Sequence, residues 1–464
     1  MSYYPISLSE VKKKVEQKHR RAKNKQQKKT LQLPSNHVKQ ITNKFGEVLT
    51  RVDGDIPPDL EVKKGDRFLF ISYDQSRYSH GIHKYPAKFF PELPRWLVKR
   101  YSKKGDLILD PFAGSATTNI EALLSERHSV GVDVDPFARF LAKTKTTALN
   151  MQETQTATQE ILAKILNFQP TSINDDILPT FPYRDNWFER DILLELAYIK
   201  QTIEDMELNE TLQNFYLVCF SSIIRAVSNA DNNCTRTVVR KKLNKEIYPS
   251  MALTKFAENV LTFQSRMFEF SEICPKNIQT EFPKNNDARY FTYPDNHFDL
   301  AVTSPPYANA VDYPRTHQLE MYWLGLVKGS LAPLKRKHVG TENVKAADYK
   351  TFHTIGVQMA DEVLKKIFEK DPRRSYIAYK YLYDMSLNMQ EVYRTLKKGG
   401  KYAIVVGNNR IRNELFESWR YLMPLAEKIG YKIDTYFGSE IIKHFIKVPR
   451  DQRINTDWVI VLEK

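Results

Sequence analysis

The residues best suited to chemistry form one short segment, Ser304-Pro305-Pro306-Tyr307, which follows an apolar run over residues 299–303. The hydroxyl of Ser304 and the carbonyl of Pro305 are hydrogen-bond acceptors, and two consecutive prolines hold this backbone rigidly. Such a pair can accept both hydrogens of an amino group, and Tyr307 adds an aromatic face beside them. A proline-rich turn or a partner-binding peptide is the alternative for this segment taken alone.

A second segment, residues 110–118, reads Asp-Pro-Phe-Ala-Gly-Ser-Ala-Thr-Thr and follows the apolar run of residues 106–110. The pattern predicts a buried strand, a tight turn and a helix over residues 117–124, and a second strand follows at residues 129–133. This unit places a carboxylate at each strand tip, where a nucleoside-type ligand can approach the backbone and Asp133 can bind ribose hydroxyls. Ordinary strand and helix caps would leave the same pattern.

Both segments resemble motifs of the amino-group DNA methyltransferases. Residues 110–118 are similar to the family's Asp-Pro-Phe-x-Gly-x-Gly-Thr cofactor motif, and Ser304 opens a sequence similar to its catalytic (Ser/Asp/Asn)-Pro-Pro-Tyr motif. Residues 83–94 resemble the flanking cofactor motif, and residues 131–136 resemble the ribose-binding strand tip. The chain departs at Ala116, where the family has its second glycine. We therefore expect an extra methyl near the methionine part of the cofactor and a weaker cofactor affinity.

The resemblance implies a cofactor, a reaction and a set of site residues. The cofactor would be S-adenosylmethionine, and its methyl group would pass directly to the exocyclic amine of a base flipped out of duplex DNA. Such an amine is a poor nucleophile because its lone pair is delocalised into the ring. The catalytic motif would accept the amino hydrogens and bend the nitrogen toward a tetrahedral geometry, while Tyr307 stacks on the base. Asp287 would contact the cofactor's adenine, with a loop cap as the alternative for that residue. The expected catalytic residues are Ser304, Pro305, Pro306 and Tyr307, and the expected cofactor-binding residues are Lys88, Phe89, Asp110, Pro111, Phe112, Gly114, Thr117, Thr118, Asp133 and Asp287.

The first residue of the catalytic motif bears on the target base. Ser304, preceded by Thr303, is similar to the N4-cytosine enzymes, whereas aspartate is usual in N6-adenine enzymes. We expect N4 of cytosine and keep N6 of adenine as the alternative, because most Ser-Pro-Pro-Tyr enzymes have the two motifs in the other order. A carbon-5 cytosine enzyme needs a nucleophilic cysteine after a proline, and here only Cys274 adjoins a proline, in the reversed order. A non-catalytic nucleic-acid-binding protein and an RNA methyltransferase are more distant alternatives.

The composition indicates the partner and the compartment. The 464 residues carry a formal net charge of +15, so the surface field should attract polyanions, and double-stranded DNA is the expected partner. The sequence shows no signal peptide and no apolar run of the roughly 20 residues that a membrane helix needs. The three cysteines are too widely spaced to predict a metal site or a disulfide framework. We expect a cytoplasmic enzyme without metal, the protective half of a restriction–modification system with a possible cognate restriction endonuclease.

Four segments are expected along the chain. Residues 1–66 are rich in lysine and predict a basic N-terminal arm, and residues 67–150 form the cofactor-binding half. Residues 151–280 predict a helical insertion and candidate target-recognition region, and residues 281–464 form the catalytic half, with a second helical insertion at about 308–376. Together they predict an α/β fold of the class I methyltransferase (Rossmann-like) type with a seven-stranded mixed sheet. The insertions supply the DNA-contact candidates, for which a solvated surface is an equal alternative. These candidates are Arg225, Arg236, Arg240, Arg315, Lys335 and Arg336.

Overall fold

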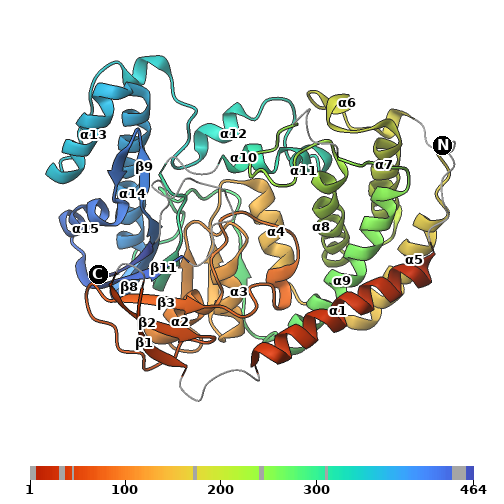
Figure 1. Cartoon of the computed structure of the whole chain (residues 1–464), viewed down its shortest axis with the longest axis horizontal. Helices are drawn as coiled ribbons and strands as arrows, with labels where there is room; N and C mark the ends of the chain where they lie inside the picture. The colour runs from red at the N-terminus through yellow and green to blue at the C-terminus, as the bar shows by residue number, and fades with distance from the viewer. Residues whose placement is uncertain are drawn as a thin grey trace.

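A ten-stranded sheet forms the centre of the molecule (Figure 1). The computed structural model describes residues 7–30, 37–43, 46–170, 175–239, 245–308, 312–441 and 456–464. Within these residues the strands of the sheet lie in the order β1-β2-β3-β11-β12-β8-β7-β4-β5-β6. Their bounds are β1 Val38–Thr42, β2 Val48–Asp53, β3 Arg67–Ile71, β4 Leu107–Asp110, β5 His128–Gly131, β6 Thr280–Glu281, β7 Phe298–Thr303, β8 Leu396–Gly407, β11 Lys432–Glu440 and β12 Thr456–Glu463. A separate hairpin pairs β9 Asn409–Ile411 with β10 Glu414–Phe416.

The strand directions determine where a ligand can bind. The strands from β6 to β8 run parallel, and β12 is antiparallel to both of its neighbours, β8 and β11. Parallel strands end at the same edge of a sheet, so the segments that follow β4, β5 and β7 converge there. These three segments begin with the cofactor turn, the ribose-type strand tip and the Ser-Pro-Pro-Tyr motif.

The sheet has ten strands rather than the seven expected from the sequence. Strands β1, β2 and β3 fall in residues 38–71, mostly inside the segment expected to be a basic arm, and they extend the sheet beyond β11. Alternating apolar side chains account for the difference, because Val52, Phe68 and Phe70 are buried against helix α2, Glu92–Tyr101. The sequence prediction followed the many lysines of this segment and therefore missed the alternation of apolar residues.

Helices cover both faces of the sheet. Successive residues of a strand point to opposite faces, so Ile108 packs in the cluster that contains α2, and Leu109 packs in the cluster on the other side. The second cluster is covered by α14, Pro372–Thr395, and α15, Ser418–Ile429. Near-continuous apolar strands of this kind are typical of a parallel sheet buried on both faces.

A helical subdomain, which contains the helices α5 to α9 between residues 151 and 273, packs beside the sheet, toward α3 Thr117–Leu124 and α4 Pro136–Thr146 (Figure 1). Its core contains Phe220, which contacts the ring of Trp323 from the second insertion, so the two insertions share one core. Helix α1 lies along α9 and buries Val11 and Val15. None of the helices in the described ranges is long and apolar enough to cross a membrane. The remaining helices are α1 Leu8–Thr30, α3 Thr117–Leu124, α4 Pro136–Thr146, α5 Met151–Leu166, α6 Arg184–Trp187, α7 Arg190–Asp205, α8 Glu210–Val227, α9 Met251–Ile273, α10 Tyr313–Thr316, α11 Gln318–Trp323, α12 Ala332–Lys337 and α13 Gln358–Lys370, with 3-10 turns η1 Tyr78–Gly81, η3 Asp175–Ile177 and η4 Ala346–Tyr349.

Candidate active site

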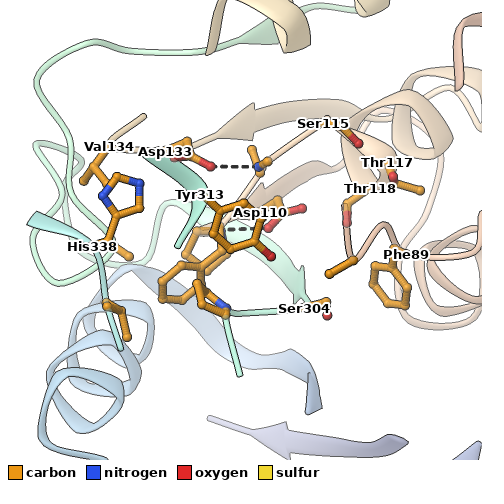
Figure 2. A pocket seen from close by; sticks show the side chains of 18 of the residues that line it. Phe89, Asp110, Ser115, Thr117, Thr118, Asp133, Val134, Ser304, Tyr313 and His338 are labelled. Atoms are coloured by element: carbon orange, nitrogen blue, oxygen red, sulfur yellow. Dashed lines mark hydrogen bonds between the residues drawn. The ribbon is translucent and has the colours of Figure 1, made fainter. Parts of the chain in front are cut away.

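A cavity lies at the carboxyl ends of β4, β5 and β7 (Figure 2), and its empty space, open solvent included, is about 790 Å³. All ten residues expected to bind the cofactor line it, from four separate stretches of the chain. Ser304 and Pro306 of the catalytic motif line the same cavity. The structure therefore brings the two motifs together around one space; what these residues bind there remains a prediction. The ten are Lys88, Phe89, Asp110, Pro111, Phe112, Gly114, Thr117, Thr118, Asp133 and Asp287.

The turn after β4 uses two residues in the left-handed conformation. Gly114 has a φ of +48°, and Ala116, which precedes α3, has φ 62° and ψ 32°. This conformation costs a residue with a Cβ about 1–2 kcal/mol, which explains why glycine suits the position. The side chain of Ala116 is fully buried and does not line the cavity. The extra methyl therefore lies in the core and not beside the cavity, contrary to the expectation from the sequence.

Asp110, at the tip of β4, is a buried carboxylate that is hydrogen-bonded to Thr303, the residue before the catalytic motif. It accepts hydrogen bonds from Thr303 Oγ1 at 2.6 Å and from the amide of Phe112 at 3.1 Å. Burial raises the pKa of Asp110 to about 6, and the hydrogen bond from Thr303 acts in the opposite direction. Because Thr303 immediately precedes Ser304, this bond ties the cofactor turn to the catalytic motif across neighbouring strands.

Asp133, just beyond β5, supports the cofactor turn from the other side. Its two carboxylate oxygens accept the amide hydrogens of Gly114 at 2.9 Å and Asp135 at 2.8 Å. Burial, followed by the nearby charge of Asp135, raises the pKa of Asp133 to about 6. Each oxygen keeps a lone pair that can accept a further hydroxyl hydrogen from the cavity.

Asp287 lines the cavity, but its carboxylate is shared with a neighbour. Arg289 donates from Nε to one carboxylate oxygen at 2.8 Å and from Nη2 to the other at 2.7 Å. Burial opposes the charged form of Asp287, yet these hydrogen bonds prevail and lower its pKa. The carboxylate is thus ionised and held in place, with its remaining lone pairs available to a ligand.

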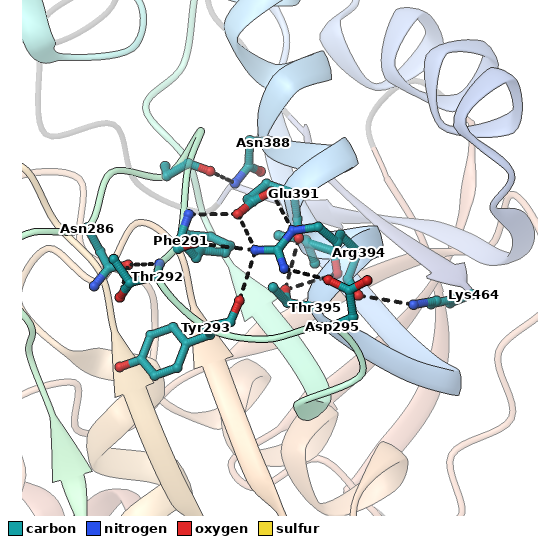
Figure 3. Close-up of polar contacts among 12 residues, drawn as sticks. Asn286, Phe291, Thr292, Tyr293, Asp295, Asn388, Glu391, Arg394, Thr395 and Lys464 are labelled. Atoms are coloured by element: carbon teal, nitrogen blue, oxygen red, sulfur yellow. Dashed lines mark hydrogen bonds and ion pairs between the residues drawn. The ribbon is translucent and has the colours of Figure 1, made fainter.

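The loop that carries Asp287 is fastened to α14 (Figure 3). Asn388 Nδ2 donates to the carbonyl of Ala288 at 2.6 Å. Arg394 binds the carbonyl of Tyr293 at 2.9 Å and the carboxylate of Asp295 at 2.6 Å. The loop that forms this wall of the cavity is therefore fixed in place by α14, a helix that packs on the sheet.

The catalytic motif is split between the cavity and the sheet behind it. Ser304 and Pro306 face the cavity, whereas Pro305 is buried and Tyr307 lies outside the cavity wall. Tyr307 Oη donates to Asp457 Oδ1 of β12 at 2.8 Å. Burial and then the adjacent Asp457 raise the pKa of Tyr307 well above its usual range. The stacking role of Tyr307 stays a prediction, and sequence reasoning missed its partner because the two residues lie far apart in the chain.

Two buried lysines lie near the cavity, and one of them, Lys145, binds the cofactor turn. Lys88 Nζ donates to the carbonyl of His80 at 2.8 Å, and burial lowers the pKa of Lys88 to about 8. Lys145 is fully buried and donates to the carbonyl of Ser115 at 2.8 Å. Burial lowers the pKa of Lys145 well below its usual value. Lys88 was expected at this site from its motif, while Lys145 lies in no motif and was missed.

Sequence reasoning also missed the residues that close the cavity from the second insertion. Tyr313 stacks on Tyr85 at 5.8 Å between ring centroids, and both line the cavity. His338 lines it too, with Nε2 at 3.7 Å from Asp135 Oδ2. Burial disfavours the charge of His338, but the carboxylate of Asp135 prevails and raises its pKa. Only Tyr85 lies in a motif-like stretch, so the sequence held no signal for the others.

No group of three His, Cys, Asp or Glu side chains in the described ranges is arranged to hold a metal ion.

Arg225, expected to contact DNA, is engaged inside the helical subdomain. Its guanidinium donates to the carbonyls of Thr235 at 3.2 Å and Asp231 at 2.9 Å, and also to that of Cys234. These bonds fold the loop after α8 back on the helix. The structure gives Arg225 a structural task in place of an exposed position toward DNA.

The other DNA-contact candidates differ in their ion pairs and in their exposure to solvent. Lys335 pairs with Asp312 at 2.8 Å, and Arg236 lies 3.7 Å from Glu342. Arg336 is exposed on α12, next to the cavity-lining Lys337 and His338. Arg315 is partly buried on α10, and Arg240 lies outside the described residues.

Comparisons with known proteins agree with the motifs. The family model N6_N4_Mtase, described as DNA methylase, matches residues 3–144, which include the cofactor turn and end before the catalytic motif. The Type II methyltransferase M.MvaI of Kocuria varians is 24% identical over 376 residues, which cover 76% of this chain and 82% of that protein. The Type II methyltransferase M.BsoBI of Geobacillus stearothermophilus is 27% identical over 415 residues, or 78% and 81% of the two chains. These matches confirm the resemblance to amino-group DNA methyltransferases of restriction–modification type.

A solved SAM-dependent methyltransferase from Methanosarcina mazei overlaps 82% of this chain and 98% of its own, with 11% identity and a TM-score of 0.29. The α/β fold of this chain is defined by the order and direction of its strands.

Proposed function

We propose that this chain, which belongs to the amino-group DNA methyltransferases, transfers a methyl group from S-adenosylmethionine to N4 of cytosine in duplex DNA. The observation that carries the proposal is the shared cavity, which Ser304 lines together with the carboxylates of Asp110 and Asp133 (Figure 2). Placing a polar acceptor and a nucleoside-type site around one space is what a direct transfer between two bound molecules requires.

The residues of the cavity fit S-adenosylmethionine. Phe89, Phe112 and Val134 supply apolar wall for a flat base, and Asp133 keeps lone pairs for ribose hydroxyls. Asp110 is a buried carboxylate whose raised pKa reflects burial, and a cationic ligand beside it would favour its ionised form. When bound, the cofactor supplies an activated methyl group on a sulfonium sulfur.

The catalytic motif prepares the amine that receives the methyl group. Ser304 Oγ and the carbonyl of Pro305 each accept one amino hydrogen, which draws the nitrogen lone pair out of the ring and toward the cavity. The two prolines fix this backbone, so the acceptors need no rearrangement on binding. The cost of unstacking the base, a few kcal/mol, is offset in part by contact with aromatic side chains.

Serine at position 304 favours cytosine over adenine, because the N4-cytosine enzymes have serine as the first residue of this motif. Adenine N6 is the second candidate, supported by the order of the motifs along the chain. The proposed partner is duplex DNA, which the net charge of +15 attracts. A cytoplasmic location and a cognate restriction endonuclease follow from the restriction–modification relatives as further parts of the proposal.

Product analysis tests the proposal directly. The protein is incubated with methyl-labelled S-adenosylmethionine and duplex DNA, and the DNA is digested to nucleosides and separated. Labelled N4-methylcytosine is the expected product. Labelled N6-methyladenine would replace the target base in the proposal, and label found only with single-stranded RNA would overturn the choice of DNA.

A substitution at Ser304 tests its assigned role. The Ser304→Ala variant should lose at least about 100-fold in turnover, a size typical of a lost transition-state acceptor, while its Kd for the cofactor changes little. Ser386→Ala, on α14 and outside the cavity wall, is the matched control and should keep wild-type turnover. Equal loss of turnover and cofactor binding in Ser304→Ala would contradict the assignment.

A further inference from the structure

A stack of aromatic rings runs from the protein core to the cavity and includes Tyr313. The rings of Tyr313 and Tyr85 are nearly parallel, with 5.8 Å between their centroids and 22° between their planes. Tyr85 also stacks on His317 at 4.9 Å and 20°, and the buried ring of Phe137 lies 4.9 Å from His317. Both tyrosines line the cavity, so the stack ends at the open space (Figure 2). A flat ligand can extend such a stack, because near-parallel rings attract at these separations.

The position of Tyr313 is fixed from two sides by the helical insertions. Tyr313 is the first residue of α10, and the N-cap residue of this helix, Asp312, pairs with Lys335 of α12 at 2.8 Å. At the other end of α10, the carbonyl of Thr316 accepts the buried hydroxyl of Thr237, from the first insertion, at 2.8 Å. The ring is therefore held in place before a ligand binds, which lowers the entropy cost of binding.

The tyrosine of the catalytic motif does not offer its ring to this cavity. Tyr307 lies outside the cavity wall, and its Oη donates to Asp457 Oδ1 at 2.8 Å. A Cβ at Gly407 would overlap the Tyr307 ring, so this ring packs directly on the backbone of β8. Tyr307 is thus engaged with the sheet, and the aromatic surface that lines the cavity with Ser304 and Pro306 belongs to other residues.

The aromatic side chains of the cavity wall come from both halves of the fold. Phe89 and Phe112 lie in the segments that resemble the family's cofactor motifs. Tyr313 lies instead in the catalytic half and lines the cavity together with Ser304, the acceptor proposed for the amino group. A base whose amino group is bound by Ser304 therefore occupies space that Tyr313 borders.

We infer that Tyr313 is the aromatic platform on which the flipped target base stacks, in the role that the motif resemblance assigns to Tyr307. The inference rests on the proposed function, because it names the residue that receives the base of an amino-group DNA methyltransferase. Flipping takes the base out of its stack in the duplex, and contact with Tyr313 restores part of what is lost. Since every base has a flat π-face, this role is the same for cytosine and for adenine.

A binding cycle on the full chain tests the inference without relying on turnover. Methylation mapping first locates the target base, and two duplexes are then made, one intact and one with an abasic residue in place of the target. Their Kd values are measured with S-adenosylhomocysteine present, for wild type, Tyr313→Ala and Tyr313→Phe. Tyr313→Ala should weaken binding of the intact duplex about 5- to 150-fold, the range for losing one base–aromatic stack. Binding of the abasic duplex should stay within about twofold of wild type, because it has no base to lose.

Tyr313→Phe separates the ring from its hydroxyl. It keeps the stacking face, so it should bind both duplexes within about threefold of wild type. Single-turnover methylation at saturating cofactor and DNA should follow the same order, with Tyr313→Ala slow and Tyr313→Phe close to wild type. The control Tyr383→Ala removes an exposed tyrosine of α14 outside the cavity wall and should match wild type in both assays.

Three outcomes would overturn the inference while leaving the proposed function intact. One is an unchanged ratio of the intact and abasic Kd values in Tyr313→Ala, since the ring would then not meet the base. Another is a Tyr313→Phe variant as weak as Tyr313→Ala, which would assign the effect to the hydroxyl. The third is a loss of S-adenosylhomocysteine affinity in Tyr313→Ala, measured by calorimetry without DNA, as large as the loss for the intact duplex; the ring would then serve the cofactor.

A wild type that transfers no methyl group to DNA would overturn both proposals. Thermal unfolding shows whether Tyr313→Ala is folded. If it is not, Tyr313→Leu replaces it in the cycle, because leucine keeps apolar volume on α10 but has no ring face, and the same change in the Kd ratio is expected.

Discussion

Replacing Thr303 by valine removes one hydroxyl with almost no change of shape, at the point where the two motifs are joined. The hydroxyl is buried and donates to Asp110 at 2.6 Å. A hydrogen bond to a charged group contributes about 1.5–3 kcal/mol, and one to a neutral group about 0.5–1.5 kcal/mol. The free energy of unfolding should therefore fall by the larger amount when Asp110 is ionised and by the smaller amount when it is protonated.

The sign of the pH dependence follows from the pKa of Asp110. Folding raises it from 3.8 to about 6, so the carboxyl contributes stability while it is protonated and loses that contribution as the pH rises through about 6. Removing the hydrogen bond from Thr303 raises this pKa further. The variant should be only slightly less stable than wild type at pH 5 and clearly less stable at pH 8.

Urea unfolding at both pH values measures the effect, with calorimetry of cofactor binding alongside. Thr303→Ser keeps the hydroxyl and loses one methyl, so its deficit, on the order of 1 kcal/mol, should be the same at both pH values. A Thr303→Val deficit that is equal at pH 5 and pH 8 would refute the reasoning. We also expect weaker cofactor binding in Thr303→Val than in Thr303→Ser, because the bond holds the cofactor turn against β7.

Three further predictions concern single side chains. Ala116→Gly should leave the Kd for the cofactor within about twofold, whereas Gly114→Ala, which places a Cβ at positive φ and 3.4 Å from a cavity-lining ring, should weaken it; calorimetry compares the two. Lys145→Met should gain stability relative to wild type as the pH falls from 9 to 7. The buried amine of Lys145 has a lowered pKa, so over this range the unfolded wild-type chain binds a proton that the folded protein does not, and the wild type loses stability. Urea unfolding at both pH values measures the difference. Arg336→Ala should weaken DNA binding and reduce its log–log salt slope by about 1. Arg225→Ala should lower the Tm, because it leaves partly buried carbonyls without their donor; equal Tm values for the two variants would contradict this.

The cofactor side of the site could be predicted from the sequence because most of its residues lie in the turn after β4 or at the tip of β5, within motif-like stretches. Asp110, Gly114 and Asp133 are placed by a strand, a turn and a helix that are adjacent in the chain, and local patterns suffice for such units. The catalytic motif was located for the same reason, since Ser304 directly follows a buried strand.

The residues that were missed depend on contacts between distant parts of the chain. Asp457 meets Tyr307 only because β12 lies beside β8, and no local pattern gives strand order or register. Tyr313 and His338 reach the cavity from an insertion without a motif. Arg225 was read as a surface charge because periodicity does not reveal that a loop folds back over it.

The hydrogen bond between Thr303 and Asp110 also shows that the cavity does not depend on the order of the motifs along the chain. Strands β4 and β7 are neighbours in the sheet, yet nearly two hundred residues separate the bonded pair along the chain. A pocket formed by neighbouring strands depends on their positions in the sheet and not on their order in the sequence. A circular permutant that enters the fold at β7 would build the same pocket, so an inverted motif order is a matter of where the chain is cut.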